Sequence, residues 1–347
     1  MVVSEVASQI RDRIPASAIR AEDYVTTDNM RPNFGGIDAS SSLPPSGNVT
    51  AFQEGDILLS NIRPYFRKTW FATHNGGCNA DILCIRANPD KCVPKYLYYL
   101  FTTNNFVNDY LKSCKGAKMP RGDVQRLLDY QFELPDLSTQ LRIAGVLGSL
   151  DEKIALNRKK IAELEALAKL VYEQFIARKQ YAYTTIGAEM PVITGKRDSN
   201  FATKNGRYRF FTCSKEKLMC DEYEFKGKSV LLSGNGDLHV KFYDGRFNAY
   251  QRTYVLMPRN EALFAPTYFA VQATLKRLTS GAAGSIVKFI TKGDVERISI
   301  PIFPNEISNL LNDQFENILA TESATEELIK LRDELLPLLM NGQVVVK

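Results

Sequence analysis

The chain has 347 residues, of which 44% are hydrophobic and 24% are charged, and its formal net charge is +5. The length fits two domains better than one, and the composition is that of an ordinary soluble protein. No apolar run approaches the roughly 20 residues that span a bilayer, and the first ten residues lack the basic and apolar regions of a signal peptide. We therefore expect a cytoplasmic protein whose mild positive charge permits a polyanionic partner without requiring one.

The sequence lacks the motifs of the common catalytic sites. It has no P-loop, no Gly-x-Gly-x-x-Gly motif after a strand, and no Asn-Pro-Pro-Tyr-type tetrapeptide of the kind that amino-methyltransferases use. With His74 and His239 as its two histidines, a Ser-His-Asp or Cys-His site is nearly excluded. The six cysteines form no Cys-x-x-Cys pair, which argues against a zinc site or a disulfide framework. We expect no catalytic residue, no metal site and no cofactor in this chain.

Residues 1–137 are predicted to form a first globular domain of mixed α/β class. Pro94 opens a helix, because proline is favoured in the first helical turn. A loop rich in glycine and basic residues follows at Lys115–Gly122, and Asp123 is placed to cap the next helix. The strands that the short apolar runs predict are Gly55–Ser60, Lys68–Ala72 and Asp81–Ile85.

Residues 138–180 are predicted to form a long spacer helix, with Ser138 in position to cap its N-terminus. Apolar residues recur in steps that alternate largely between three and four, which is the seam of a coiled coil. They are Ile143, Leu147, Leu150, Ile154, Ile161, Leu164, Val171 and Phe175. Asn157 lies on this seam, where it either fixes the register and pairing of the helix or is a local polar exception at a helix junction.

Residues 181–304 are predicted to form a second domain of the same class, and residues 305–347 a second spacer helix. The second helix is expected to kink or end near Pro337, and Asn341-Gly342 is a C-terminal stop signal. The signals within the domain are a strand over Gly227–Ser233, a tight turn at Ser233–Gly236, a strand over Tyr254–Leu256 and a helix that opens near Pro266.

The second half of the chain repeats the first. Leu58-Leu59-Ser60 returns as Leu231-Leu232-Ser233, and Gly122-Asp123-Val124 returns as Gly293-Asp294-Val295. At one constant offset Leu147, Ile154 and Leu167 return as Leu311, Ile318 and Leu331. A repeat of this length indicates two whole domains, each with its own spacer. The repeat fails in one turn, where Arg63-Pro64-Tyr65 is replaced by Gly234-Asn235-Gly236.

Each long helix needs a partner for its apolar seam, and the other helix is the nearest one. With the two domains related by a pseudo-twofold axis, the helices would pair as an antiparallel coiled coil. A helix of about 40 residues is roughly 60 Å long, and one turn of DNA is roughly 34–36 Å. Such a rod could hold two DNA-reading domains about one to two turns apart on one duplex.

Basic and aromatic residues gather in the loops of both domains. Arginine and lysine bind phosphates, arginine can grip guanine through two hydrogen bonds, and asparagine can read adenine. For any single residue a solvated surface is the simpler interpretation, but the recurrence of the set in both domains favours contact with DNA. The predicted DNA-binding residues are Asn61, Arg63, Tyr65, Lys68, Lys115, Lys118, Arg121, Asn235, Lys241, Tyr250, Arg252 and Lys288.

Several segments carry a family resemblance through their order, spacing and duplication. They are Thr26–Met30 with Gly35–Ile37, Gly55–Tyr65, Lys115–Asp123, Leu147–Ile154 with Asn157–Lys159, and Leu331–Gly342. Taken together, they make the chain resemble the specificity subunits of type I DNA restriction-modification systems, over nearly its whole length.

The resemblance implies a subunit that is not itself a catalyst. Each domain would be a target-recognition domain that reads one half of a split sequence in double-stranded DNA. The two spacer helices would set the gap between the halves and dock two modification subunits, which would bring S-adenosylmethionine and methylate adenine. Restriction subunits would add translocation and cutting with ATP and Mg. The chain is on the short side for this family, which leaves the gap between the half-sites open.

Two other functions compete with this one. Glu224-Phe225-Lys226, with Asp221, superficially resembles the metal site of a stand-alone nuclease, although such a triplet arises by chance in most proteins of this size. The other alternative is a coiled-coil adaptor that never touches DNA.

Overall fold

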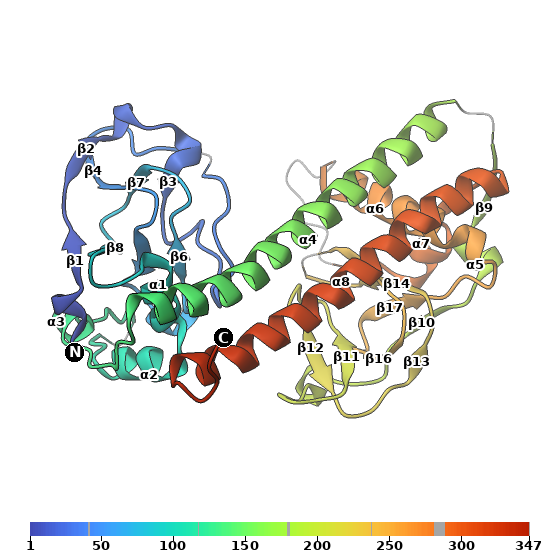
Figure 1. The fold of residues 1–347 in the computed structure, drawn as a ribbon. Helices are drawn as coiled ribbons and strands as arrows, with labels where there is room; N and C mark the ends of the chain where they lie inside the picture. Colours follow the sequence, from blue (N-terminus) through green and yellow to red (C-terminus); the bar gives the residue numbers. More distant parts are fainter. Residues whose placement is uncertain (41, 117, 179–180, 237, 281–288, 347) are drawn as a thin grey trace. The chain divides into compact units, whose positions relative to one another are not determined.

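The computed structural model describes residues 1–40, 42–116, 118–178, 181–236, 238–280 and 289–346 (Figure 1). The chain forms two compact units, which we call unit 1 (Met1–Ile154 with Glu327–Lys347) and unit 2 (Ala155–Glu326). Each unit contains a body of mixed α and β structure and part of each of two long helices, α4 (Leu137–Ala177) and α8 (Asn305–Met340). The predicted fold class, two tandem α/β bodies that are each followed by a long helix, is confirmed.

The body of unit 1 is built from two four-stranded sheets and three short α-helices (Figure 1). The first sheet, of order β1-β8-β5-β6, is antiparallel and contains β1 (Ala7–Ile10), β8 (Ile82–Ala87), β5 (Ile57–Ser60) and β6 (Thr69–Phe71). The second sheet, of order β2-β4-β7-β3, contains β2 (Arg13–Pro15), β4 (Asn48–Phe52), β7 (Gly76–Cys78) and β3 (Tyr24–Val25). The helices are α1 (Pro94–Thr102), α2 (Asn104–Lys112) and α3 (Val124–Leu128), and η1 (Val3–Glu5) and η4 (Pro64–Phe66) are 3-10 turns.

The central strand β5 explains why these layers stack. Side chains alternate between the two faces of a strand, and all four residues of β5 are buried. Ile57 and Leu59 pack into the core under the helices, whereas Leu58 packs into a second core between the two sheets. In the larger core Tyr130 lies edge-on against Phe106, with ring centroids 5.1 Å apart. A strand covered on both faces is a rigid base for the turn that follows it.

Unit 2 contains the same layers. The first sheet, of order β10-β17-β14-β15, contains β10 (Val192–Thr194), β17 (Thr253–Leu256), β14 (Ser229–Ser233) and β15 (Val240–Tyr243). The second, of order β12-β11-β16-β13, contains β12 (Leu218–Cys220), β11 (Tyr208–Phe211), β16 (Arg246–Ala249) and β13 (Phe225–Lys226). The unit also contains β9 (Ala182–Thr185), β18 (Ser299–Ile302), α5 (Ile186–Glu189), α6 (Phe264–Ser280) and α7 (Lys292–Glu296), with 3-10 turns η5 (Ser199–Phe201) and η6 (Glu261–Leu263).

The predicted repeat is therefore present in the pairing of the strands. β14 takes the place of β5, and its residues alternate in the same way, because Val230 and Leu232 pack under the helices and Leu231 packs between the sheets. Each second sheet also contains one parallel pair, β3 with β7 in unit 1 and β11 with β16 in unit 2. The first sheets of the two bodies thus share one strand order and are antiparallel throughout. The second sheets share three strands, β4-β7-β3 and β13-β16-β11, and differ in the fourth, because β2 pairs with β4 whereas β12 pairs with β11.

One motif of the predicted repeat is shifted along the chain between the two units. The Gly-Asp-Val motifs do not occupy equivalent positions, because Asp123 is the N-cap of α3 and the N-cap of α7 is Thr291. Asp294 is the third residue of α7 and completes a capping box with Thr291. The Asp123 and Thr291 side chains do the same work, accepting a hydrogen bond from a free amide of the first helical turn.

The ends of the long helices differ in detail from the prediction. Asp136, rather than Ser138, caps α4, because its Oδ1 accepts the Thr139 amide at 3.0 Å and the Ser138 hydroxyl at 2.6 Å. These hydrogen bonds lower the pKa of Asp136 well below its usual value. α8 continues past Pro337 to Met340 and then stops at Gly342, whose φ of 68° is the left-handed conformation that favours glycine.

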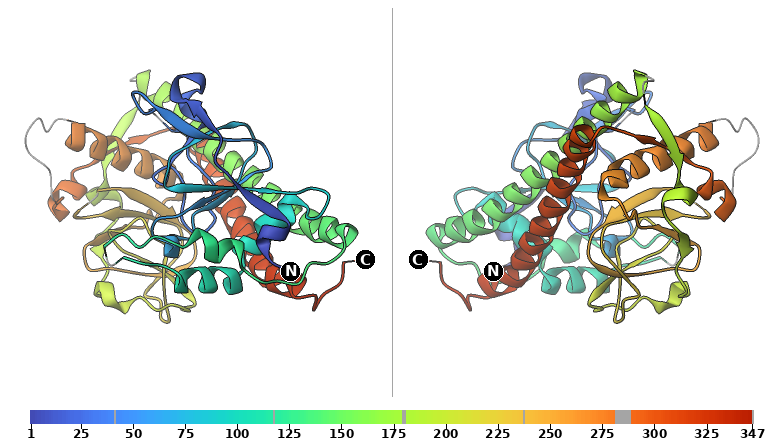
Figure 2. Two further views of the ribbon diagram at one scale, coloured as in Figure 1. Left: turned by 90° about the vertical axis from the view of Figure 1, so that its left-hand side faces the viewer. Right: turned by 90° about the vertical axis from the view of Figure 1, so that its right-hand side faces the viewer.

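Within each unit, segments of the two long helices run antiparallel (Figure 2). In unit 1 Arg332 donates to Asp151 at 3.0 Å, and Tyr99 donates to the other oxygen of Asp151 at 2.7 Å. In unit 2 the Asn157 amide donates to Thr325 Oγ1 at 3.1 Å, and Thr325 in turn donates to the Thr321 carbonyl at 2.6 Å. The Asn157 side chain is thus buried and paired on the seam, which supports a role in helix register over a local exception.

We expect a measurable coupling between Asn157 and Thr325. In a double-mutant cycle of Asn157→Ala and Thr325→Val, the interaction energy should be about 1 kcal/mol, because each change removes one partner of a buried hydrogen bond. Urea unfolding of the four proteins measures it, with Leu156→Ala on the exposed face of α4 as the control partner for Thr325→Val. A coupling energy within error of zero would show that the seam asparagine stabilises nothing through Thr325.

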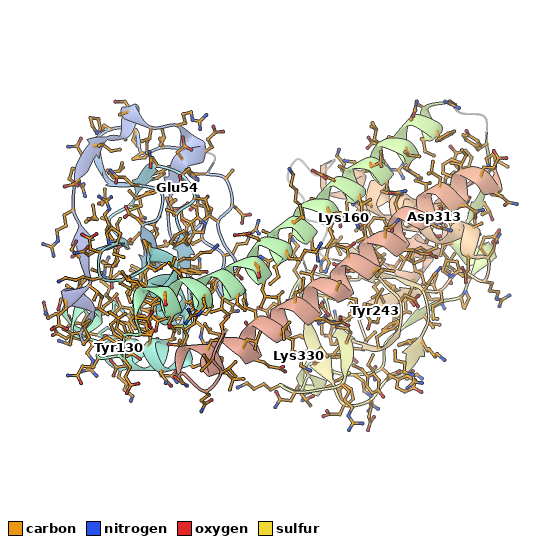
Figure 3. All side chains as sticks on the ribbon, viewed as in Figure 1. Glu54, Tyr130, Lys160, Tyr243, Asp313 and Lys330 are labelled. Atoms are coloured by element: carbon orange, nitrogen blue, oxygen red, sulfur yellow. The ribbon has the colours of Figure 1, made fainter. Side chains whose placement is uncertain are left out.

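Two carboxyl groups face the same cavity of about 390 Å³ in unit 2, Glu165 of α4 and Glu322 of α8. Burial, and then the nearby Glu322 carboxylate, raise the pKa of Glu165. Burial also raises the pKa of Glu322, and Glu326 adds to this rise while Lys217 and Arg209 oppose it. Tyr243, which is labelled in Figure 3, also lines this cavity.

Unit 2 should therefore lose stability as the pH rises through the raised pKa values. The folded state holds these protons more tightly than the unfolded state, so its advantage is complete at low pH and is lost once both groups ionise. Glu322→Gln should raise the free energy of unfolding at pH 8 by up to about 1 kcal/mol and leave it unchanged near pH 4. Denaturant titrations at the two pH values test this, with exposed Glu327→Gln as the control; an equal effect at both pH values would contradict it.

Candidate nucleic-acid interface

A strained turn follows the central strand of unit 1. The 3-10 turn η4 is flanked by Arg63 and Arg67, both in the left-handed conformation with φ of 46° and 53°. An arginine in this conformation costs on the order of 1 kcal/mol, and such strain persists only where the surroundings enforce it. The turn is closed by its own hydrogen bonds, from the Phe66 amide to the Arg63 carbonyl at 3.0 Å and from the Arg67 amide to the Pro64 carbonyl at 2.9 Å.

Two loops from elsewhere in the sequence hold this turn in place. The amides of Asn33 and Phe34 donate to the carbonyls of Phe66 and Arg67, at 2.9 Å and 3.0 Å. On the other side the Arg63 amide donates to the Pro120 carbonyl at 2.8 Å. The predicted segments Asn61–Lys68 and Lys115–Arg121, distant in the sequence, are therefore neighbours in the folded unit.

Some of the predicted DNA-binding side chains of unit 1 already have partners inside the protein. Asn61 accepts a hydrogen bond from the Tyr110 hydroxyl at 2.8 Å, and Lys68 donates to the Thr27 carbonyl at 2.6 Å. Arg121 forms an ion pair with Asp81 at 2.7 Å. These contacts position the loops, and each side chain keeps further hydrogen-bonding groups for a ligand.

Other predicted side chains of unit 1 project into solvent. Arg63, Tyr65, Lys115 and Lys118 are all exposed. Within the described part of the chain, no side-chain hydrogen bond or ion pair joins Arg63, Lys115 or Lys118 to another residue. They form a set of free cations on two loops that are fixed to each other through their backbones.

Unit 2 presents its predicted residues on neighbouring turns. The Gly234 amide donates to the Arg252 carbonyl at 2.8 Å, and the Ile290 amide donates to the Gly234 carbonyl at 2.9 Å. Asn235 pairs with Phe289 across a short bridge, and Phe289 is 65% exposed. The side chain of Arg252 is exposed and that of Tyr250 is half-buried.

Two predicted residues of unit 2 stand apart from this set. Lys241 donates to the Ser214 carbonyl at 2.6 Å and lies 6.0 Å from the centre of the Phe211 ring, and burial lowers its pKa. Lys241 lines the same cavity as Glu165 and Glu322. Through the hydrogen bond to Ser214, its ammonium group already has a partner within the protein. Lys288 lies outside the described residues.

Sequence reasoning missed the loop at residues 31–38 as a support for this surface. Asn33 and Phe34 are themselves left-handed, with φ of 53° and 58°, and the Arg31 side chain pairs with Asp38. The Gly35-Gly36 pair was the signal that could have indicated a tight turn here.

In the Glu224-Phe225-Lys226 triplet considered for a nuclease, the glutamate has a partner within the protein. Glu224 Oε1 lies 2.5 Å from Lys196 Nζ, and the side chains of Asp221 and Lys226 are exposed. Among the residues that the structure describes, no group of three or more His, Cys, Asp or Glu side chains could hold a metal ion.

Within this described part no helix is both long enough and apolar enough to cross a membrane.

Comparison with known proteins identifies the family. The family model for the type I restriction modification DNA specificity domain matches residues 19–166 and again residues 180–331. The chain belongs to this family. The two matches fall on the two halves of the repeat, as expected if each half contains one specificity domain.

Curated relatives of this specificity-domain protein include three named specificity subunits. It is 33% identical to that of type I restriction enzyme EcoDI from Escherichia coli over 170 residues, which are 46% of this chain and 37% of the relative. It is 23% identical to that of MjaIX from Methanocaldococcus jannaschii over 354 positions, covering 86% and 80% of the two chains. It is 26% identical to that of HindI from Haemophilus influenzae over 137 residues, covering 38% and 30%. The chain thus matches less than two thirds of the length of the Escherichia and Haemophilus relatives.

A solved structure shares the fold. The S subunit of a type I restriction-modification system from M. genitalium aligns over 98% of this chain and 95% of its own, with a TM-score of 0.62 and 15% sequence identity. At this identity the likeness concerns the fold alone, and it agrees with two α/β bodies and two long helices.

We expect Arg63→Gly to leave unit 1 as stable as the wild type or to raise its free energy of unfolding by up to about 1 kcal/mol, because glycine adopts a positive φ without strain. Arg11→Gly, at an exposed position without a positive φ, is the control and should lower it by about 0.5–1 kcal/mol. Chemical denaturation measures both. A clear loss of stability in Arg63→Gly would mean that the guanidinium contributes to folding and is not held in this strained position for a ligand.

Proposed function

We propose that this chain is the sequence-recognition subunit of a type I restriction-modification complex, a DNA-binding protein that has no catalytic role of its own. The observation that carries the proposal is the pair of loop platforms, each built on a buried central strand and each presenting an exposed arginine, Arg63 in unit 1 and Arg252 in unit 2. Arginine and lysine beside such a turn can bind phosphates, and arginine can read guanine.

We further propose the following division of the chain: residues 1–137 and 181–304 are target-recognition domains, and residues 138–180 and 305–347 are spacer helices. Each recognition domain reads one half of a bipartite site in double-stranded DNA. Because the turns of the two units differ in sequence and shape, the two half-sites differ as well. Methyl transfer and DNA cutting belong to partners: two modification subunits that use S-adenosylmethionine, and restriction subunits that use ATP and Mg.

Mapping of methylated adenines tests this function. The chain, co-expressed with the modification subunits of its own system, should methylate adenines in a split motif with a fixed gap. Arg63→Gly and Arg252→Ala should each broaden one half of the motif and leave the other half unchanged, since a lost base contact costs about 1–3 kcal/mol at its own position. The chain alone with Mg should leave DNA uncut.

Three results would contradict the proposal. An unsplit motif would exclude two independent readers, and broadening of both halves by one variant would exclude the assignment of one half to each unit. DNA cutting by the isolated chain that is lost in Glu224→Ala would favour the nuclease. Binding that does not weaken with salt would argue against phosphate contacts, because these release counterions.

A further inference from the structure

Two aromatic side chains stand at the tip of the strained turn in unit 1. Tyr65 is 49% exposed and Phe66 is 41% exposed, and their ring centroids lie 4.7 Å apart. Large aromatic side chains bury 150–250 Å² in a typical core, so exposing two of them side by side forgoes a large stabilisation. The pair is therefore a feature that the packing of unit 1 does not explain.

The backbone under the two rings is rigid. Pro64 is buried, Arg63 and Arg67 enclose the turn in left-handed conformations, and hydrogen bonds from Asn33 and to Pro120 hold the turn from two sides. These contacts fix the backbone from which the two exposed rings project. The strained turn thus presents two exposed rings at its tip, and backbone strain of this kind is characteristic of preorganised functional sites.

The surroundings of the rings match the chemistry of nucleic acid. Arg63, Lys115 and Lys118 are exposed cations on the two joined loops, and the Lys68 ammonium lies 5.8 Å from the centre of the Phe66 ring. Met119, 47% exposed, adds an apolar side chain directly after Lys118. Cations bind phosphates, and flat rings stack on bases, so the combination fits a base step whose backbone is held on either side.

We propose that Tyr65 and Phe66 form a wedge that enters the duplex and unstacks one base step in the half-site read by unit 1. The proposal rests on the proposed function, because it requires that unit 1 bind DNA. Apolar and aromatic wedges of this kind partly unstack a step and kink the duplex, and the deformation costs least at flexible pyrimidine–purine steps. Unit 1 would then read its half-site partly through the ease with which one step opens.

The direct test uses 2-aminopurine, a base whose fluorescence rises when it is unstacked. It is placed at successive positions of the half-site that Arg63→Gly broadens, in duplexes bound by the complete complex with its modification subunits. Neither the methylated adenine nor its immediate neighbours carry the probe, because a methyltransferase flips its target base out of the stack. We expect a several-fold rise at one of the remaining steps with the wild-type complex. The rise should be lost in the double variant Tyr65→Ala/Phe66→Ala and retained in Tyr65→Phe, which keeps the ring. Phe289→Ala, which removes an exposed ring from unit 2, is the matched control and should also retain it.

A second measurement compares the affinity of the complex for matched and mismatched duplexes, because unstacking a base step lowers the affinity for a fully paired duplex. A single mismatch at the step where the fluorescence rises weakens its stacking before the protein binds. The wild-type complex should therefore bind the mismatched duplex on the order of tenfold more tightly than the matched one. The double variant should bind matched and mismatched duplexes equally. Because both rings are exposed, we expect the variant to fold, and its thermal unfolding curve checks this.

The outcomes separate the wedge from the function on which it rests. Sequence-specific binding by the wild-type complex with no bright position, or a rise that persists in the double variant, overturns the wedge alone. A double variant that folds but no longer assembles with the modification subunits assigns the rings to a protein contact, and this too overturns the wedge. No preference of the wild-type complex for the mapped site over a scrambled duplex overturns both proposals.

Discussion

Backbone hydrogen bonding joins the turn after the buried central strand to the segment that leads into a short capped helix, and one of these hydrogen bonds is equivalent in the two units. The Gly122 amide donates to the Asn61 carbonyl at 3.0 Å in unit 1, and the Ile290 amide donates to the Gly234 carbonyl at 2.9 Å in unit 2. The strand is buried on both faces, so the turn has a fixed base, and the hydrogen bond brings a segment distant in the sequence to its side. In unit 1 every exposed cation that we assign to DNA stands on one of these two segments. The buried strand and the backbone hydrogen bond place the two segments side by side. The identity of the side chains on these segments does not determine that placement.

The same scaffold supports two different turns. In unit 1 Arg63 and Arg67 take up the left-handed conformation at a cost in free energy, whereas in unit 2 Gly236 takes up a φ of 70° without one. A layer arrangement that both units share, with turns that differ, fits our proposal that one fold reads two different half-sites. The helices and sheets of the two units agree, whereas their turns differ in sequence and in backbone conformation.

The long helices combine apolar pairing with buried polar contacts. The residues matched by the repeat have matched burial: Leu147 and Leu311 are buried, as are Ile154 and Ile318, while Leu167 and Leu331 are both exposed. Asn157 and Thr325 replace apolar contact by a hydrogen bond in unit 2, and the Arg332–Asp151–Tyr99 network does so in unit 1. An apolar seam can slide by one turn at little cost, whereas a misplaced buried polar group loses its partner, so these contacts favour one register.

The sequence by itself determined the two-domain repeat, the two long helices, the central strands and the cap at Asp123, because these depend on periodicity and local hydrogen bonding that a few neighbouring residues specify. It failed where distant residues compete or cooperate. It chose Ser138 as the cap where Asp136 accepts both the Thr139 amide and the Ser138 hydroxyl, and it aligned Asp294 with Asp123 where Thr291 is the equivalent cap. Only the tertiary structure decided which predicted side chains are free: Arg63 projects into solvent, whereas Asn61, Lys68 and Lys241 each meet an internal partner. The physical reason is that a residue type fixes what a side chain can bind, while the fold fixes what lies within its reach.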